Sequence, residues 1–428
     1  MIKILRENAE ILSFIEAVKQ RGGENCEVEK IVREIADDVR KNGDAAVKKY
    51  TSKFDCEDAE YYRVPQEIIN VAFEKADAKL MDALTRCKAN IEAFHKMQKR
   101  EGYTLEQAQG VVLKQVIRPL ERVGLYVPGG TAPLVSTVLM CAVPAKIAGV
   151  KEIIMTTPPQ KNGAPNPEIL AAAKLCGVDK IFLCGGAQAV AAMAFGTEEI
   201  PRADKIVGPG NAFVATAKKM LYGTVDIDMV AGPSEILIIA DETANPQYIA
   251  ADLLSQAEHD TLASSVLVTT SEQLASVVSV ETERQTAALP RREIAEKSLK
   301  EYGAIIIVSD IEAAVEIANK IAPEHLQVMT KNPEELEKKL ENYGSLFIGE
   351  YSPEPLGDYF AGPNHVLPTN GTARFSSPLT VDDFIKKSSV IKYTKEALKD
   401  AAQTITLIAE REGLDAHANS IKVRIKDV

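Results

Sequence analysis

The dipeptide Glu-His occurs twice in this chain, in SQAEHD (residues 255–260) and in APEHLQ (residues 322–327). In the second stretch Glu324 and His325 are adjacent acid and base candidates, because a histidine titrates near neutral pH and can take a proton from a substrate. Side chains at such a position, where a predicted helix runs into a predicted strand, can face a crevice in an α/β protein. On spacing alone, a solvated Glu-His pair is the more ordinary interpretation.

The first stretch lies near the end of a helix predicted over residues 245–260. Gln256 and His259 are three residues apart, so their side chains share one face of that helix, whereas Glu258 points elsewhere. An amide oxygen and an imidazole nitrogen can both bind a divalent cation. The pair alone is poor evidence for a metal site, because a lone histidine near a helix end is more often structural.

Two later stretches contain further polar candidates. The segment EPLGDYFAGPNHVLPT (354–369) has no helical or strand period, and it contains Asp358 and His365. Its aromatic residues favour a binding loop over a disordered one. In EREGLDAHANS, Glu412 and His417 lie near a predicted helix end. These nitrogen and oxygen donors could form a metal site without thiols, of the kind that suits zinc, manganese or cobalt.

Three glycine turns each follow a predicted strand, at residues 126–133 (YVPGGTAP), 183–190 (LCGGAQAV) and 207–214 (VGPGNAFV). Free backbone N–H groups and the helix dipole make such turns suitable for phosphates. None has the GxGxxG pattern, and no acidic ribose ligand follows at the usual offset. A single turn of this kind is a plain strand-to-helix connection, but three in one segment favour a nucleotide bound in an unusual way.

The elements that would position these residues alternate between strand and helix. From about residue 130 to 240, short apolar runs, glycine turns and helical segments repeat, which predicts a parallel sheet with crossover helices. A second series of apolar runs follows between residues 264 and 350. The sequence therefore predicts an α/β fold of two units, one inserted in the other. Residues from about 378 are helical and charged, and they end in the strand-like SIKVRIKDV.

The composition is that of an ordinary globular protein of 428 residues, with 46% hydrophobic and 26% charged residues. The formal net charge of −11 argues against nucleic acid or an anionic membrane as the main partner. No signal peptide pattern is visible, and the longest mostly apolar stretch (132–145) is too short to span a bilayer. The six cysteines show no metal-like spacing. We therefore expect a cytoplasmic protein with reduced thiols.

Seven motifs, in this order, resemble those of the histidinol dehydrogenase family: GLYVPGGTAPL, GGAQAVAAMAFGT, VGPGNAFVA, AGPSEIL, SQAEHD, APEHL and AGPNHVLPT. The resemblance runs from about residue 20 to the C-terminus. It implies a zinc- and NAD-dependent oxidation of L-histidinol through L-histidinal to L-histidine, the last steps of histidine biosynthesis. It also implies two Rossmann-like α/β domains like those of aldehyde dehydrogenases, small terminal extensions, and a homodimer with shared active sites.

The resemblance assigns roles to individual residues. The zinc ligands would be Gln256, His259, Asp358 and His417. Glu324 and His325 would be the catalytic pair, with His325 taking protons and Glu324 activating water. Tyr126, Gln188 and Asn211 would contact NAD. The substrate would contact Ser234, Gln256, His259, His325, Asp358, Glu412 and His417. Glu258 would be solvated and Cys184 structural.

The implied domain boundaries complete the expectation. They are an N-terminal helical extension (1–21), a discontinuous larger α/β domain (22–125 and 236–377), an inserted NAD-binding domain (126–235), and a C-terminal helical extension (378–428) that reaches the partner's site. Two other functions stay open. One is a zinc-dependent hydrolase, in which no dinucleotide would bind. The other is a non-catalytic homologue that binds a metal or a nucleotide, against which the intact Glu324-His325 pair argues.

Overall fold

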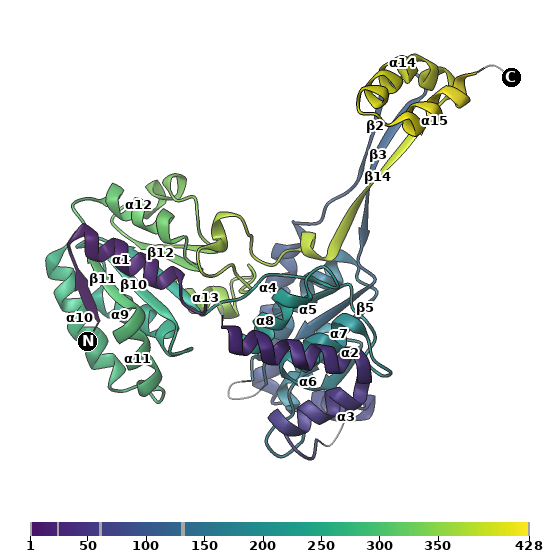
Figure 1. Cartoon of the computed structure of the whole chain (residues 1–428). Coiled ribbons are helices and arrows are strands. Elements are labelled where there is room, and N and C mark those ends of the chain that lie inside the picture. Colours follow the sequence, from purple (N-terminus) through teal and green to yellow (C-terminus); the bar gives the residue numbers. More distant parts are fainter. Residues whose placement is uncertain (1, 24, 60–61, 130–132, 427–428) are drawn as a thin grey trace. The chain divides into compact units, whose positions relative to one another are not determined.

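The computed structural model describes residues 2–23, 25–59, 62–129 and 133–426 (Figure 1). The chain forms two compact units, one of residues 1–98 and 120–384 and the other of residues 99–119 and 385–428. The first unit contains two parallel sheets, and the second contains one antiparallel sheet. In the described residues, no helix is long and apolar enough to cross a membrane.

The larger sheet of the first unit has six parallel strands. Their spatial order is β1 (Lys3–Leu5), β11 (Gly303–Ile307), β10 (Ser264–Thr269), β9 (Glu235–Ala240), β12 (His325–Met329) and β13 (Ser345–Ile348). Central strands such as EILIIA are buried along their whole length, as expected for a sheet covered on both faces. One face packs on α1 (Asn8–Lys19) and α12 (Ile311–Ile321). The other packs on α9 (Pro246–Ala257), α10 (Glu272–Thr286) and α11 (Arg292–Tyr302).

The second sheet of this unit has five parallel strands. Their order is β6 (Lys180–Leu183), β5 (Glu152–Thr157), β4 (Arg122–Tyr126), β7 (Lys205–Val207) and β8 (Asp226–Ile227). One core cluster joins it to α3 (Gln66–Lys75), α4 (Ala78–Lys96), α5 (Val135–Ala148) and α6 (Pro167–Cys176). The other joins it to α2 (Cys26–Phe54), α7 (Gly186–Phe195) and α8 (Ala212–Leu221). The predicted inserted α/β fold is thus confirmed, since the chain leaves the six-stranded sheet after α1 and returns to it at β9.

The packing of the N-terminal hundred residues differs from the expected grouping of 22–125 with 236–377. Helices α2, α3 and α4 pack instead on helices α7, α6 and α5 of the five-stranded sheet. The segment 1–21, expected to be helical, also contributes an edge strand, β1, which pairs with β11. Apolar periodicity shows which face of a helix is buried, but it does not show which sheet covers that face.

The second unit pairs β2 (Tyr103–Ala108), β3 (Val111–Pro119) and β14 (Ile385–Tyr393) in the order β14-β3-β2. Two helices follow, α14 (Lys395–Arg411) and α15 (Asp415–Ile425), which pack side by side (Figure 1). The strand predicted in SIKVRIKDV (420–428) is therefore wrong. Its residues up to Ile425 belong to helix α15, which packs on α14.

The remaining elements are short. A single helix, α13 (Glu354–Tyr359), lies in the stretch that was expected to be irregular. The 3-10 turns are η1 (Pro333–Glu335), η2 (Glu337–Lys339), η3 (Thr372–Arg374) and η4 (Val381–Phe384).

Candidate active site

Two neighbouring strands of the six-stranded sheet begin side by side, at the amino-terminal ends of its strands. His325 begins β12 and Glu235 begins β9. The Nδ1 atom of His325 lies 2.9 Å from the carbonyl oxygen of Glu235. Its Nε2 atom is buried and has no hydrogen-bond partner among the described residues. The imidazole is thus fixed through one nitrogen, and the other is available for chemistry.

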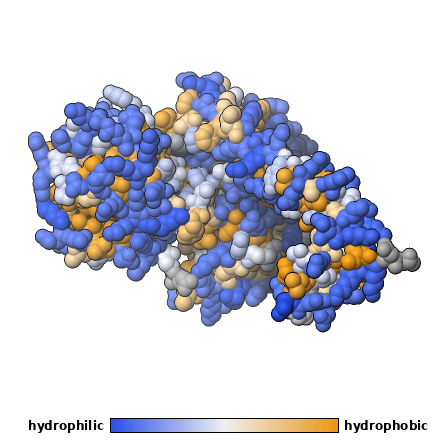
Figure 2. Space-filling model, turned by 90° about the horizontal axis from the view of Figure 1, so that it is seen from above, coloured by the Kyte–Doolittle hydropathy of each residue, from blue (hydrophilic) through white to orange (hydrophobic). Residues whose placement is uncertain are grey.

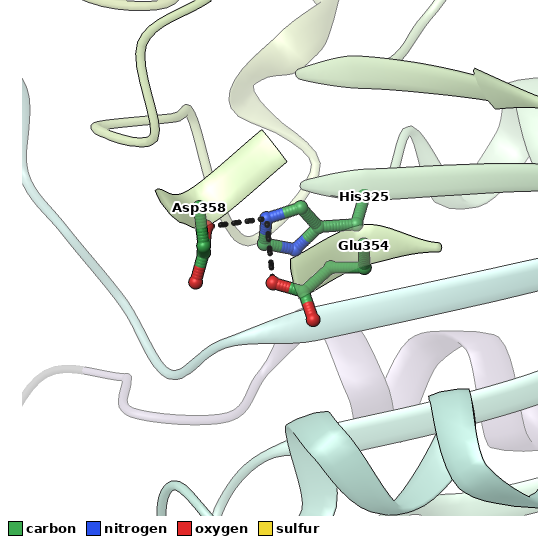
Figure 3. Close-up of side chains that lie close together, drawn as sticks. All are labelled: His325, Glu354 and Asp358. Carbon is green, nitrogen blue, oxygen red and sulfur yellow. Dashed lines mark ion pairs between the residues drawn. The ribbon is translucent and has the colours of Figure 1, made fainter. Parts of the chain in front are cut away.

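Two carboxylates of α13 flank that free nitrogen (Figure 3). Glu354 Oε1 and Asp358 Oδ1 each lie 3.8 Å from His325 Nε2. Because they are four residues apart on one helix, both point to the same side. The other carboxylate oxygen of Glu354 accepts a 3.0 Å hydrogen bond from Ser255 in α9. One donor atom from each of His325, Glu354 and Asp358 lies within 4.8 Å of the others, so the three could hold a metal ion.

Sequence reasoning missed Glu354. The available signal was the proline after it, which suits the first turn of a helix, together with the four-residue spacing to Asp358. The glycine at position 357 and the surrounding prolines hid that signal, since they are typical of a loop. The interpretation of 354–369 as wholly irregular is corrected by α13.

The electrostatics of this cluster favour positive charge. Burial acts to lower the pKa of His325, but Glu324, Asp358 and Glu354 raise it to about 10. Burial raises the pKa of Glu324 to about 8. Burial and the charge of Asp358 raise the pKa of Glu354 to about 7. Burial also acts to raise the pKa of Asp358, but His325 and His365 hold it well below its ordinary value. A cation or an ammonium group would be stabilised here.

Glu324 is the residue before β12, and its side chain is held from the neighbouring strand. Its Oε2 atom accepts a 2.9 Å hydrogen bond from the backbone N–H of Glu235. The turn that leads into it places Ala322 in the left-handed region, with φ of 54°, at the end of α12. An alanine pays a conformational cost for that geometry, on the order of 1–2 kcal/mol. The fold thus tolerates local strain just before Glu324 and His325.

The end of α9 brings Gln256 and His259 toward the same cluster. Gln256 is buried, and neither its amide oxygen nor its amide nitrogen has a hydrogen-bond partner among the described residues. His259 is exposed, two residues beyond the helix. Surrounding protein lowers its pKa, while the negative charge of Asp358 acts in the opposite direction. A buried amide without a partner is costly, which indicates that a ligand completes this side of the cluster.

His365, left without a role by the sequence, also contacts this region. Its Nδ1 atom lies 3.1 Å from the carbonyl oxygen of Asp358, and its Nε2 atom lies 3.5 Å from the hydroxyl of Thr137 in α5. Burial lowers its pKa. The ring of His365 thus connects α13 to α5, the helix that follows the first glycine turn.

The expected NAD contacts lie at the carboxyl ends of strands in the five-stranded sheet. Tyr126 ends β4, and its hydroxyl accepts a 3.1 Å hydrogen bond from the N–H of Gly186. Gln188 lies in the first turn of α7, where its amide nitrogen is 3.4 Å from Asp55. Asn211 caps α8 and accepts hydrogen bonds from two backbone N–H groups. Dinucleotides bind at this edge of open α/β sheets.

The third glycine turn approaches Tyr126 closely. A Cβ atom on Gly208, whose φ is 112°, would lie 2.2 Å from the carbonyl oxygen of Tyr126. Only glycine fits there, so the turn and the end of β4 are held together. The middle of the first glycine turn, residues 130–132, lies outside the described residues. Cys184, beside the second turn, is buried with a raised pKa, as expected for a structural thiol.

The other expected substrate contacts are spread more widely. Ser234 precedes β9, and its carbonyl oxygen accepts a 2.9 Å hydrogen bond from Ser264. Glu412 ends α14 and His417 lies in α15, and both are exposed on the second unit. Glu258, expected to be solvated, is half-buried at the end of α9.

A buried histidine beside the carboxylates of Glu324, Glu354 and Asp358, in a chain with two parallel sheets, is typical of an α/β enzyme. The family model described as histidinol dehydrogenase matches residues 18–425. The chain belongs to the histidinol dehydrogenase family.

Individual relatives agree over nearly the whole chain. Histidinol dehydrogenase of Clostridium acetobutylicum is 57% identical over 414 residues, which cover 96% of each chain. That of Bacillus cereus is 53% identical over 426 residues, covering 100% of this chain and 96% of the other. The crystal structure of histidinol dehydrogenase from Elizabethkingia anophelis superposes with a TM-score of 0.92 at 41% identity, covering 99% of this chain and 98% of that one.

Proposed function

We propose that this protein catalyses the NAD-dependent, zinc-dependent oxidation of L-histidinol through L-histidinal to L-histidine, in the cytoplasm, as the last steps of histidine biosynthesis. The observation that carries the proposal is the free Nε2 atom of His325 between the carboxylates of Glu354 and Asp358, in a chain that matches histidinol dehydrogenases over nearly its whole length. The surplus of negative charge in the cluster suits a substrate that carries an amine.

His325 is the base of the alcohol step. Its Nδ1 atom faces the carbonyl oxygen of Glu235, an acceptor, so this nitrogen carries the ring proton and Nε2 can accept the proton of the substrate hydroxyl. NAD, held near Tyr126, Gln188 and Asn211, would supply the hydride acceptor. A cation bound in the cluster opposes the carboxylates that raise the pKa of His325, and it thereby favours the neutral ring that a base requires.

Glu324 serves the aldehyde step. The aldehyde must add water before it can lose a second hydride, and a carboxylate can take the proton of that water. Its pKa of about 8 lies near the working pH, where general acid–base catalysis is most effective. His325 then takes the next proton. Cysteine chemistry is not needed, and the thiol of Cys184 is buried with a raised pKa.

The residues fit a zinc ion held by Gln256, His259 and Asp358, with His417 of a second copy of the chain as the fourth ligand. The orphaned amide of the buried Gln256 supports this set. A site made of His325, Glu354 and Asp358 is the geometric rival. It would occupy the Nε2 atom that must accept a proton, and it would leave Gln256 unexplained. These residues would hold zinc where the imidazole and the amine of histidinol could chelate it, which would orient the alcohol carbon.

A homodimer with shared sites is supported by the second unit, which buries few of its own residues. Its buried apolar residues are Val111, Ala402, Ala409 and Ala418. Many large apolar residues stay exposed: Tyr103, Leu105, Val390, Ile391, Tyr393, Ile405, Leu407, Ile408, Leu414 and Val423. Figure 2 shows hydrophobic residues, in orange, exposed on the surface toward the right of the view. So small a unit needs a larger surface to pack on, and a second copy of the chain would provide it.

The test is a histidinol-dependent assay of NADH formation, with and without a chelator. We expect two NADH per histidinol consumed, histidine as the product, and loss of turnover after chelation that zinc restores. Hydrolytic activity without NADH would indicate the zinc hydrolase, and binding of NAD or zinc without turnover would indicate the non-catalytic homologue.

A further inference from the structure

A buried ion pair lies directly behind the acid–base pair. The Nη2 atom of Arg21 is 2.5 Å from Glu235 Oε1, and the exposed fractions of the two side chains are 0% and 3%. Two more hydrogen bonds of Arg21 hold the guanidinium from other sides, one to the carbonyl oxygen of Val18 (2.8 Å) and one to that of Leu262 (2.7 Å). The guanidinium therefore has little freedom to move.

Glu235 connects this ion pair to both catalytic residues. Its second carboxylate oxygen, Oε2, accepts a 3.2 Å hydrogen bond from the backbone N–H of Glu324. Its own N–H donates to the carboxylate of Glu324 at 2.9 Å, and its carbonyl oxygen faces His325 Nδ1 at 2.9 Å. Of the two catalytic residues, the side chain of Glu235 hydrogen-bonds only Glu324, whereas the backbone of Glu235 contacts both.

Stability alone is a weak reason for such a pair. Two buried charges lose their hydration, and well-packed apolar residues of similar size often fold equally well in their place. The pair does give a fixed geometry. Arg21 draws one oxygen of Glu235 toward itself, which leaves the other oxygen aimed at the backbone of Glu324. Without Arg21, the carboxylate of Glu235 would be a buried anion beside the carboxylate of Glu324.

We infer that Arg21 and Glu235 are positioning residues, which hold Glu324 in place for the water-addition step of the aldehyde oxidation. The inference rests on the proposed function, because it assumes that Glu324 activates water. Arg21 acts through Glu235, and neither side chain needs to touch the substrate. The segment before residue 22 therefore contributes to catalysis as well as to the edge of the sheet.

The test uses the double variant Arg21→Met/Glu235→Leu in the zinc-loaded full-length enzyme, with histidinol and histidinal as alternative substrates. We expect kcat from histidinal to fall about tenfold to a hundredfold, a size typical of residues that orient a catalytic group. The first hydride transfer from histidinol and the KM values for both substrates should change little. The single variant Arg21→Lys should retain more of the aldehyde step than the double variant, though less than wild type, because it keeps a cation beside Glu235.

Arg6→Met is the matched control, since Arg6 also pairs with a glutamate, Glu272, but is half-exposed. It should leave both steps unchanged. A folded double variant with a wild-type aldehyde step would overturn the inference, and so would equal losses in both steps. If the double variant does not fold, Arg21→Lys alone decides, because a wild-type aldehyde step in that variant also refutes the inference. Failure of the wild-type enzyme to oxidise histidinol would instead refute the proposed function.

Discussion

The Nδ1 atom of His325 lies 2.9 Å from the carbonyl oxygen of Glu235, and this contact turns Nε2 toward Glu354 and Asp358. A backbone carbonyl cannot lose or gain a proton at working pH, so the orientation of the ring does not depend on the ionisation of its neighbours. We therefore expect the two proposed roles, proton transfer by His325 and water activation by Glu324, to be separable in variants.

We predict that His325→Asn cripples the oxidation of histidinol, whereas Glu324→Gln mainly slows that of histidinal. A positioned acid or base contributes about 10²–10⁴ in rate. Transient kinetics of the first hydride transfer, followed by steady-state rates with histidinal, separate the two steps. A Glu324→Gln enzyme that is slow already at the first hydride transfer would show that the roles are not divided in this way.

Glu354→Gln should shift the acidic limb of the plot of kcat against pH to lower pH, by roughly one pH unit. Ionised Glu354 stabilises the protonated form of His325, so its removal lowers the pKa of His325 and the neutral base persists at lower pH. The effect should be largest above about pH 7, where Glu354 is ionised. Glu316→Gln, an exposed carboxylate of α12, is the control. A limb that stays in place or moves upward would contradict the prediction.

Glu324 should make the metal-free protein less stable as pH rises. Burial raises its pKa from 4.5 to about 8, so between these values the folded protein holds a proton that the unfolded chain releases. The free energy of unfolding therefore falls across this window. Glu324→Gln lacks the effect, and its stability relative to wild type should grow from pH 4.5 to pH 8. Urea unfolding at several pH values measures this, and a constant difference would argue against the raised pKa.

Removal of zinc should abolish turnover while the affinity for NAD changes little. The expected metal ligands belong to elements around the six-stranded sheet or to the second unit, whereas the expected NAD contacts lie on the five-stranded sheet. Calorimetric titration of NAD into chelator-treated and zinc-restored protein compares the two states. A large loss of NAD affinity in the treated protein would mean that the metal also shapes the cofactor site.

Complementation tests whether each site combines two chains. His259→Ala and His417→Ala should each be inactive, but the two proteins unfolded and refolded together should recover roughly a quarter of wild-type activity, because half of the randomly paired dimers are mixed and each has one intact site. Each variant refolded alone is the control. No recovery, with mixed dimers present, would place the whole site within one chain.

The sequence predicted the parallel sheets well, because they depend on local patterns, and the roles given to Glu324 and His325 stay predictions. Buried strands such as EILIIA are continuous apolar runs, and Glu324 and His325 lie in a recognisable motif. The partners of α2 and of β1 were not predictable, since an apolar helix face or a three-residue strand fits several surfaces. Glu235 and Arg21 were missed for a similar reason, as they meet across 214 residues of sequence.

The edge position of β1 has a consequence for synthesis on the ribosome. Lys3 pairs with Ala304, so the first strand of the chain must wait for a partner that is made about 300 residues later. At about 5–20 residues per second, that delay is roughly 15–60 s. All strands of the five-stranded sheet have been made well before then, because they end at Ile227. We therefore expect this sheet to form first in the nascent chain, and Arg21 to reach Glu235 only after most of the chain has left the ribosome.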